Sequence, residues 1–126
     1  MDVNNGIFQK LIFIYNADSG LGNMLLDGAH KILSPNTYDC SLCSLTFGAF
    51  SEKSEWKKFR EESKAEMEFL HKDEFKKQYA SKFGHKFTFP IVLVEGNKEL
   101  EVFIFTDEMN NLENQEELID LINQRL

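Results

Sequence analysis

The feature of this sequence that most constrains its fold is an apolar run followed at once by a break containing glycine. Residues 11–14 are four consecutive large apolar residues, and residues 16–20 interrupt the run. A continuous apolar run bounded by turn residues is typical of a strand buried on both faces. We therefore expect a central strand over residues 8–15. Open α/β sheets place their sites in crevices beyond the carboxyl ends of such strands.

Length and charge limit the class of protein. A chain of 126 residues with 42% hydrophobic residues fits one domain, residues 1–126, with a core of its own. The net charge of -7 argues against nucleic acid or an anionic membrane as partner. No apolar run approaches a membrane span, and the N-terminal residues do not resemble a signal peptide. We expect a cytoplasmic protein that needs no cofactor.

The break leads into a helix over about residues 19–33. Ser19 can cap its start, and the pair Ser34–Pro35 ends it, because a residue before proline is pushed out of the α region. Apolar residues recur at helical spacing along it, namely Leu21, Met24, Leu25, Ala29, Ile32 and Leu33. This pattern predicts one apolar face on the helix.

The remaining elements follow from periodicity and turn residues. Apolar residues occupy every second position from Tyr38 to Leu42, and again, in the opposite phase, from Cys43 to Phe47. This pattern predicts a strand with a bulge or turn at Leu42 and Cys43. A charged helix follows, with Trp56 and Phe59 expected to pack against the sheet. We then expect, in order, a strand over 66–71, a helix from Asp73 to Gly84, a strand over 87–94, a turn at 95–98, a strand over 100–105, an acidic loop and a final helix.

This order of elements resembles the thioredoxin-like fold. EMEFLHKDEFKKQYASKFGHKFTFPIVLVEGNKELEVF resembles that family's strand, helix, proline-headed strand and glycine turn, and YNADSGLGNM resembles the segment around its redox Cys-x-x-Cys. The resemblance implies an α/β fold, a mixed sheet flanked by helices, with an insertion at about residues 34–65. It also implies that the proline at the position of Pro90 is cis and lies beside the active site.

The resemblance fails where the family's redox pair would stand, because this chain has Ser19 and Gly22 there. Neither residue can form a disulfide. What remains is a helix start beside the proline-headed strand, which can hold an extended peptide backbone. The first hypothesis is therefore a binding or accessory module whose groove is formed by Asp18, Ser19, Gly20, Phe89 and Pro90, with a protein or peptide segment as partner.

The only Cys-x-x-Cys motif of the chain lies further on, at Cys40 and Cys43. The second hypothesis is a thiol–disulfide oxidoreductase in which these two cysteines are catalytic. On a regular strand, residues three apart point to opposite faces, so the two sulfurs converge only in a turn or at a helix start. Reduced cysteines packed as small apolar residues are the simpler interpretation.

Zinc is a third alternative for the same two cysteines. A Cys₂His₂ site would need two of the three histidines, which lie far apart in the sequence at His30, His71 and His85. Because no second Cys-x-x-Cys or closely spaced histidine pair exists, the sequence predicts no metal site. Whether the chain is an enzyme is left open by the sequence.

Overall fold

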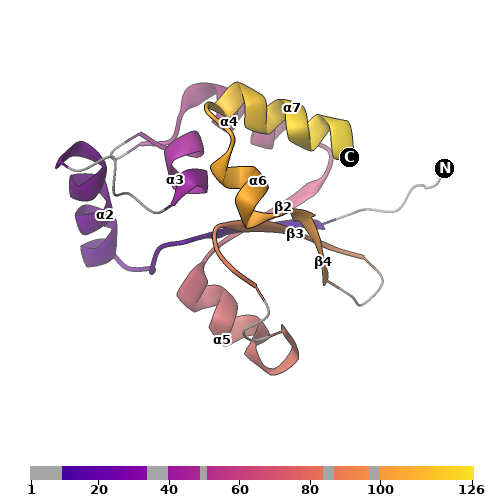
Figure 1. Cartoon of the computed structure of the whole chain (residues 1–126), viewed down its shortest axis with the longest axis horizontal. Helices are drawn as coiled ribbons and strands as arrows, with labels where there is room; N and C mark the ends of the chain where they lie inside the picture. The colour runs from indigo at the N-terminus through magenta and orange to yellow at the C-terminus, as the bar shows by residue number, and fades with distance from the viewer. Residues whose placement is uncertain (1–9, 34–39, 49–50, 84–86, 97–99) are drawn as a thin grey trace.

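The protein is an α/β structure built on one mixed four-stranded sheet. The computed structural model describes residues 10–33, 40–48, 51–83, 87–96 and 100–126 (Figure 1). Its elements are β1 (Lys10–Tyr15), α2 (Leu21–Leu33), α3 (Ser41–Thr46), α4 (Ser54–Glu62), β2 (Glu66–His71), α5 (Lys72–Phe83), β3 (Ile91–Glu95), β4 (Leu100–Ile104), α6 (Thr106–Asn110) and α7 (Gln115–Arg125). The predicted α/β class is confirmed.

The strands lie in the order β2-β1-β3-β4, so β1 is an interior strand, as its apolar run predicts. β1 and β2 are parallel, whereas β1 pairs antiparallel with β3 and β3 pairs antiparallel with β4. Ile14 stands opposite Ile91, so the carboxyl end of β1 lies beside the residues that precede β3. The peptide bond between Phe89 and Pro90 is cis, and Pro90 is buried there.

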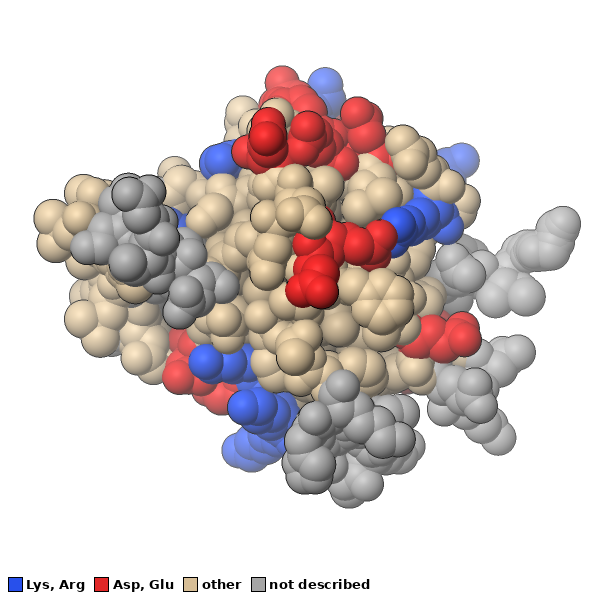
Figure 2. Space-filling model, viewed as in Figure 1, with Lys and Arg blue, Asp and Glu red and all other residues tan. Residues whose placement is uncertain are grey.

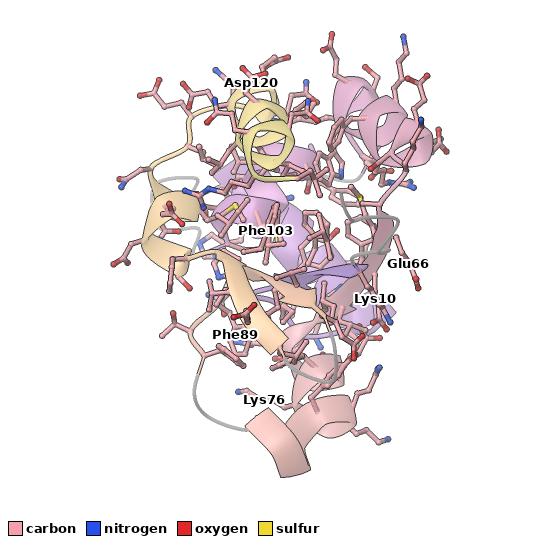
Figure 3. All side chains as sticks on the ribbon, turned by 90° about the vertical axis from the view of Figure 1, so that its right-hand side faces the viewer. Lys10, Glu66, Lys76, Phe89, Phe103 and Asp120 are labelled. Atoms are coloured by element: carbon pink, nitrogen blue, oxygen red, sulfur yellow. A yellow bond between two sulfur atoms is a disulfide. The ribbon has the colours of Figure 1, made fainter. Side chains whose placement is uncertain are left out.

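Alternate residues of β1 supply two separate cores, because successive side chains of a strand point to opposite faces. Leu11 and Phe13 belong to one core, and Ile12 and Ile14 belong to the other. Figure 1 shows α5 alone on one side of the sheet and α3, α4, α6 and α7 on the other. In Figure 3, Phe89 and Lys76 lie on the α5 side, and Phe103 lies toward α7.

The tryptophan of the charged helix is the largest side chain of the first core. Trp56 on α4 is fully buried, and its ring meets Phe13 edge-on with 5.5 Å between centroids. Phe59 is partly buried against the same core, 5.7 Å from Trp56. The prediction that these two residues pack against the sheet is confirmed.

The apolar side chains of α2 that the structure describes do not form a buried face. Leu25, Leu26, Ile32 and Leu33 are all exposed. Figure 1 shows the reason, because α2 stands at the edge of the molecule, beyond α3, and does not cover the sheet. The helix itself spans the predicted residues.

The segment before α4 is a helix, and the predicted strand over residues 38–47 is wrong in its described part. Leu42, Cys43, Leu45 and Thr46 are the buried residues of α3, and their spacing is that of one helix face. The same apolar residues fit two alternating phases of a strand. Burial against α6 and α7 selects the helical period.

A second short helix replaces part of the predicted acidic loop. α6 buries Met109, and the carboxylate of Glu108 accepts the N–H of Phe105 at 3.0 Å, which satisfies a donor at the helix start. Figure 2 shows acidic side chains gathered over α6 and α7 and basic ones over α5. Residues 97 and 98 of the predicted turn lie outside the described residues, and so does Gly84.

Among the residues that the structure describes, no helix has both the length and the apolar character to cross a bilayer.

Candidate redox site at the end of the central strand

Cys40 and Cys43 form a disulfide at the start of α3, with 5.2 Å between their Cα atoms. Cys40 is the N-cap residue of this helix, in an extended conformation, and Cys43 lies in its first turn. This is one of the two arrangements in which the sequence allows cysteines three apart to converge. Two reduced cysteines packed separately are therefore not what the structure contains, although both residues are buried.

The sulfur of Cys40 accepts two backbone hydrogen bonds. The N–H of Cys43 donates to it at 3.2 Å, and the N–H of Asn16 donates to it at 3.3 Å. Asn16 directly follows the last residue of β1, so the disulfide lies at the carboxyl end of an interior strand of the sheet. Two N–H donors stabilise a sulfur more strongly when it carries a negative charge.

Lys31, near the end of α2, joins that helix to α3. Its ammonium group donates to the carbonyl oxygen of Cys43 at 3.3 Å and to that of Gly48 at 3.1 Å. It also lies 5.9 Å from the centroid of the Phe47 ring. The positive charge of Lys31 therefore lies next to the backbone carbonyl of Cys43.

Tyr15, the last residue of β1, is mostly buried. Tyr15 packs edge-on against Phe47, with 6.2 Å between ring centroids. Burial, together with the nearby carboxylate of Glu52, raises the pKa of Tyr15 far above its ordinary value, so the phenol stays neutral. Glu52 in turn accepts two hydrogen bonds from the Arg60 guanidinium, both at 2.6 Å.

The five residues of the predicted binding groove all lie around the carboxyl end of β1. Asp18 and Gly20 are exposed in the segment that follows the strand, and Gly20 has a φ of 110°, which favours glycine. Pro90 is buried directly before β3, and Phe89 is partly buried. The structure brings these residues to one end of the sheet, and their role as a binding groove stays a prediction.

Two of these groove residues, Ser19 and Phe89, already contact other residues of the chain. The N–H and the hydroxyl of Ser19 donate to the carboxylate of Asp73, at 2.9 and 2.6 Å. These bonds lower the pKa of Asp73. The two groups through which Ser19 donates therefore reach α5, across the sheet from α3, whereas its carbonyl oxygen accepts from Asn23 of α2 at 3.0 Å.

Phe89 also faces the α5 side, 5.9 Å from Phe75 between ring centroids and 5.7 Å from the ammonium group of Lys76 (Figure 3). The disulfide belongs to the opposite core. The predicted groove and the cysteine pair thus share one end of the sheet but not one face of it.

The described residues provide no third ligand for a metal at the cysteines. Within the described ranges, no three His, Cys, Asp or Glu side chains are grouped closely enough to hold an ion. His30 and His71 lie on α2 and β2, and His85 lies outside the described residues. The zinc alternative therefore gains no support from this part of the chain.

Sequence reasoning missed two residues of the site. The sequence predicts Asn16 only as part of the break after the strand, and its contribution comes from a backbone N–H, which carries no sequence signal. Lys31 stands in the last turn of a helix, where cations are common for reasons of helix polarity alone. The signal that could have revealed the helix start is the spacing of Leu42 and Leu45, three apart behind Cys40.

The fold and the site define an α/β protein with a mixed four-stranded sheet and a Cys-x-x-Cys disulfide at the carboxyl end of an interior strand. No protein-family model matches the chain, and searches of curated proteins and of solved structures return no match either.

Proposed function

We propose that this protein is a thioredoxin-like thiol–disulfide oxidoreductase and that Cys40 and Cys43 are its redox pair. The observation that carries the proposal is their disulfide at the start of α3, where the sulfur of Cys40 also accepts the N–H of Asn16. Of the two main hypotheses from the sequence, this geometry favours the oxidoreductase, because the binding module assumes that sulfur is missing from the end of β1.

The arrangement of elements supports the thioredoxin-like part of the proposal. β1 and β2 are parallel, β3 and β4 return antiparallel, and Pro90 stands immediately before β3. In this proposal the additional segment is residues 17–39, in place of the expected insertion at about residues 34–65. The helix start beside β1 is then that of α3, and it carries both cysteines.

The chemistry available to the pair is two-electron exchange. In the reduced state, the N–H groups of Asn16 and Cys43 would donate to a Cys40 thiolate and lower the pKa of that thiol. A lowered thiol pKa makes the sulfur a better leaving group when the disulfide is attacked. If the protein is cytoplasmic, as its sequence suggests, a disulfide there is typically transient or catalytic.

The direct test is reduction of insulin with dithiothreitol as the electron source. Because the chain has only two cysteines, every thiol reaction of the protein belongs to this pair. We expect wild-type protein to accelerate insulin precipitation, and Cys40→Ser and Cys43→Ser variants to lose that acceleration. A glutathione redox titration, read by alkylation and mass spectrometry, should show a reversible intramolecular disulfide.

Two results would refute the proposal. One is insulin reduction that persists in both variants, because the activity would then not depend on the pair. The other is a wild-type disulfide that excess dithiothreitol leaves intact in the folded protein. In that case the pair is a structural crosslink, and the binding module of Asp18, Ser19, Gly20, Phe89 and Pro90 becomes the leading hypothesis.

A further inference from the structure

We propose that this protein forms a two-fold symmetric dimer in which α2 of one chain packs antiparallel against α2 of a second copy. The proposal does not depend on the chemistry of Cys40 and Cys43. It follows from three properties of α2: its position at the edge of the molecule, the arrangement of its exposed apolar side chains about Ala29, and the area that they offer.

α2 is covered by little of its own chain. Figure 1 shows this helix at the edge of the molecule, beyond α3. None of the other described helices or strands packs along it in the way that α4 packs along α7. A helix of 13 residues has little stability in water by itself, so packing against another surface would stabilise it.

One side of α2 faces its own chain, and Lys31 marks that side. The ammonium group of Lys31 donates to the carbonyl oxygens of Cys43 and Gly48. Residues two positions apart lie on nearly opposite sides of an α-helix. Ala29 is two positions before Lys31 and therefore belongs to the side that turns away from α3.

The exposed apolar residues of α2 are placed symmetrically about Ala29. Leu25 and Leu26 lie four and three positions before it. Ile32 and Leu33 lie three and four positions after it. In chain order the exposed fractions of these four residues are 53%, 70%, 58% and 79%. Because residues three and four positions apart share a helix face, the four residues form one apolar stripe with Ala29 at its centre.

This symmetry selects a second copy of the chain as the occupant of the stripe. A two-fold axis through Ala29, perpendicular to α2, places Leu25 against Leu33 of the second copy. The same axis places Leu26 against Ile32 of the second copy. The small side chain of Ala29 lies at the crossing point, where it lets the two helix axes approach closely. The antiparallel order also brings opposite ends of the two helix dipoles together, whereas an unrelated partner would require no such symmetry.

The exposed area is sufficient for a weak dimer. From their exposed fractions, the four residues of the stripe offer about 500 Å² in each chain, as much as the large and often functional patches of monomeric proteins. Contact between two copies would bury about 1,000 Å² in total, which is the lower limit for a specific interface. We therefore expect association at about micromolar concentrations.

The first test is sedimentation equilibrium of the full chain at concentrations from about 1 to 200 µM, which bracket a micromolar dissociation constant. Non-reducing electrophoresis verifies that no disulfide joins two chains. We expect the mass to rise from 14.7 kDa to twice that value, with no larger species. The mass of a single chain over the whole range would overturn the proposal and leave the stripe to a partner of another kind. A series of larger species would also overturn it, because a two-fold contact closes at two copies.

A substitution of Ala29 separates a fitted interface from a surface that is merely apolar. Ala29→Leu adds apolar area at the centre of the stripe, so unspecific association would become stronger. At the crossing point of two helices the larger side chains would collide, and we expect the dissociation constant to rise by about tenfold or more. Association as tight as that of wild-type protein, or tighter, would overturn the crossing at Ala29.

Charge variants provide the matched control for this experiment. Leu26→Lys places a charge within the stripe and should also raise the dissociation constant by about tenfold or more. Leu126→Lys changes an exposed leucine outside α2 and should leave the dissociation constant unchanged. Equal effects of the two variants would overturn the assignment of the interface to α2. The fluorescence of buried Trp56 verifies that each variant is folded.

Cross-linking determines the orientation of the two helices. Leu25→Cys and Leu33→Cys are prepared separately in a chain that also carries Cys40→Ala and Cys43→Ala, and are then oxidised alone and as a mixture. Antiparallel helices bring position 25 of one chain to position 33 of the other, so the mixture should form more cross-linked dimer than either variant alone. More cross-linking within each separate variant than between them would overturn the antiparallel arrangement, because parallel helices bring identical positions together.

Discussion

Reduction of the Cys40–Cys43 disulfide should destabilise the protein by an amount that follows from the length of the loop it closes. The two residues are three apart in the sequence. In the chain-entropy model, closing a loop of about four residues removes about 6 cal/mol/K from the unfolded chain, which is about 2 kcal/mol at room temperature. The value is small because the loop is among the shortest that a disulfide can close.

The assay is urea unfolding with and without reductant, followed by the fluorescence of the single tryptophan. Trp56 is fully buried in the same core as the cysteine pair, so its emission reports on that core. With a slope of about 2 kcal/mol per molar urea, the midpoint should fall by about 1 M on reduction. Thiol counting confirms in each sample that reduction is complete.

The matched control is the double variant Cys40→Ala/Cys43→Ala, whose midpoint should not respond to reductant. Equal midpoints for oxidised and fully reduced wild-type protein would refute the entropy argument. A more stable reduced form would refute it more strongly, because the hydrogen bonds to the Cys40 sulfur would then outweigh the crosslink.

Three further predictions concern the scaffold around the site. Leu42→Ala should cost about 2–5 kcal/mol of unfolding free energy, because Leu42 is fully buried on α3, and a urea-unfolding loss below that range would contradict tight packing there. The Arg125 ion pair and the N–H of Phe105 lower the pKa of Glu108 to about 2. The stability from this pair is therefore present above the ordinary carboxyl pKa and lost as pH falls from about 5 to 2, and for a side chain 34% exposed it amounts to about 1 kcal/mol after solvent screening. Glu108→Gln should flatten that part of the stability–pH curve, and an unchanged curve would contradict the assignment. Asp73→Ala should speed hydrogen exchange at the Ser19 amide, measured by NMR, because Asp73 accepts that N–H, and an unchanged rate would show that the bond is unimportant.

The strands of this fold could be predicted from the sequence because their apolar patterns admit a single interpretation. β1 follows from four consecutive buried residues, 11–14, and the strands at 66–71 and 100–104 begin where the sequence predicts. The predicted strand over 87–94 is wrong in its start, because β3 begins at Ile91, directly after the cis bond to Pro90. α2 also lies within the predicted residues, yet four of its described apolar side chains are exposed, because a helical period indicates a helix and not what covers it. Leu26 and Leu33 illustrate this limit.

The short helices could not be predicted in the same way, because six or five residues contain too little periodicity to separate a helix from a strand. In α3, Leu42 and Leu45 fit a helix at a separation of three, whereas Cys40 and Leu42 fit a strand at a separation of two. Packing against α6 and α7 decides between them, and that packing involves residues more than sixty positions later. α6 depends likewise on the burial of Met109.

The site shows that residues far apart along the chain can lie at the same end of the sheet. By distance from β1, the resemblance to thioredoxin-like proteins puts their redox pair at Ser19 and Gly22, and this predicts that the redox chemistry has been lost. In space, the sulfur of Cys40 lies at the N–H of Asn16, although the two residues are 24 positions apart. The chain thus passes the end of β1 a second time, carrying two cysteines at a helix start.

The prediction that redox chemistry has been lost assumed that no cysteine lies at the end of β1, and the contact of Cys40 with Asn16 contradicts that assumption. A redox site requires two sulfurs within bonding reach and hydrogen-bond donors that stabilise a thiolate, and it does not require that they follow the strand directly in sequence. Cys40 and Cys43 meet the first requirement through their disulfide, and the N–H groups of Asn16 and Cys43 meet the second. The segment of residues 17–39 can therefore be an addition ahead of the site, and the absence of cysteine from Ser19 and Gly22 then carries no weight against exchange chemistry at the end of β1.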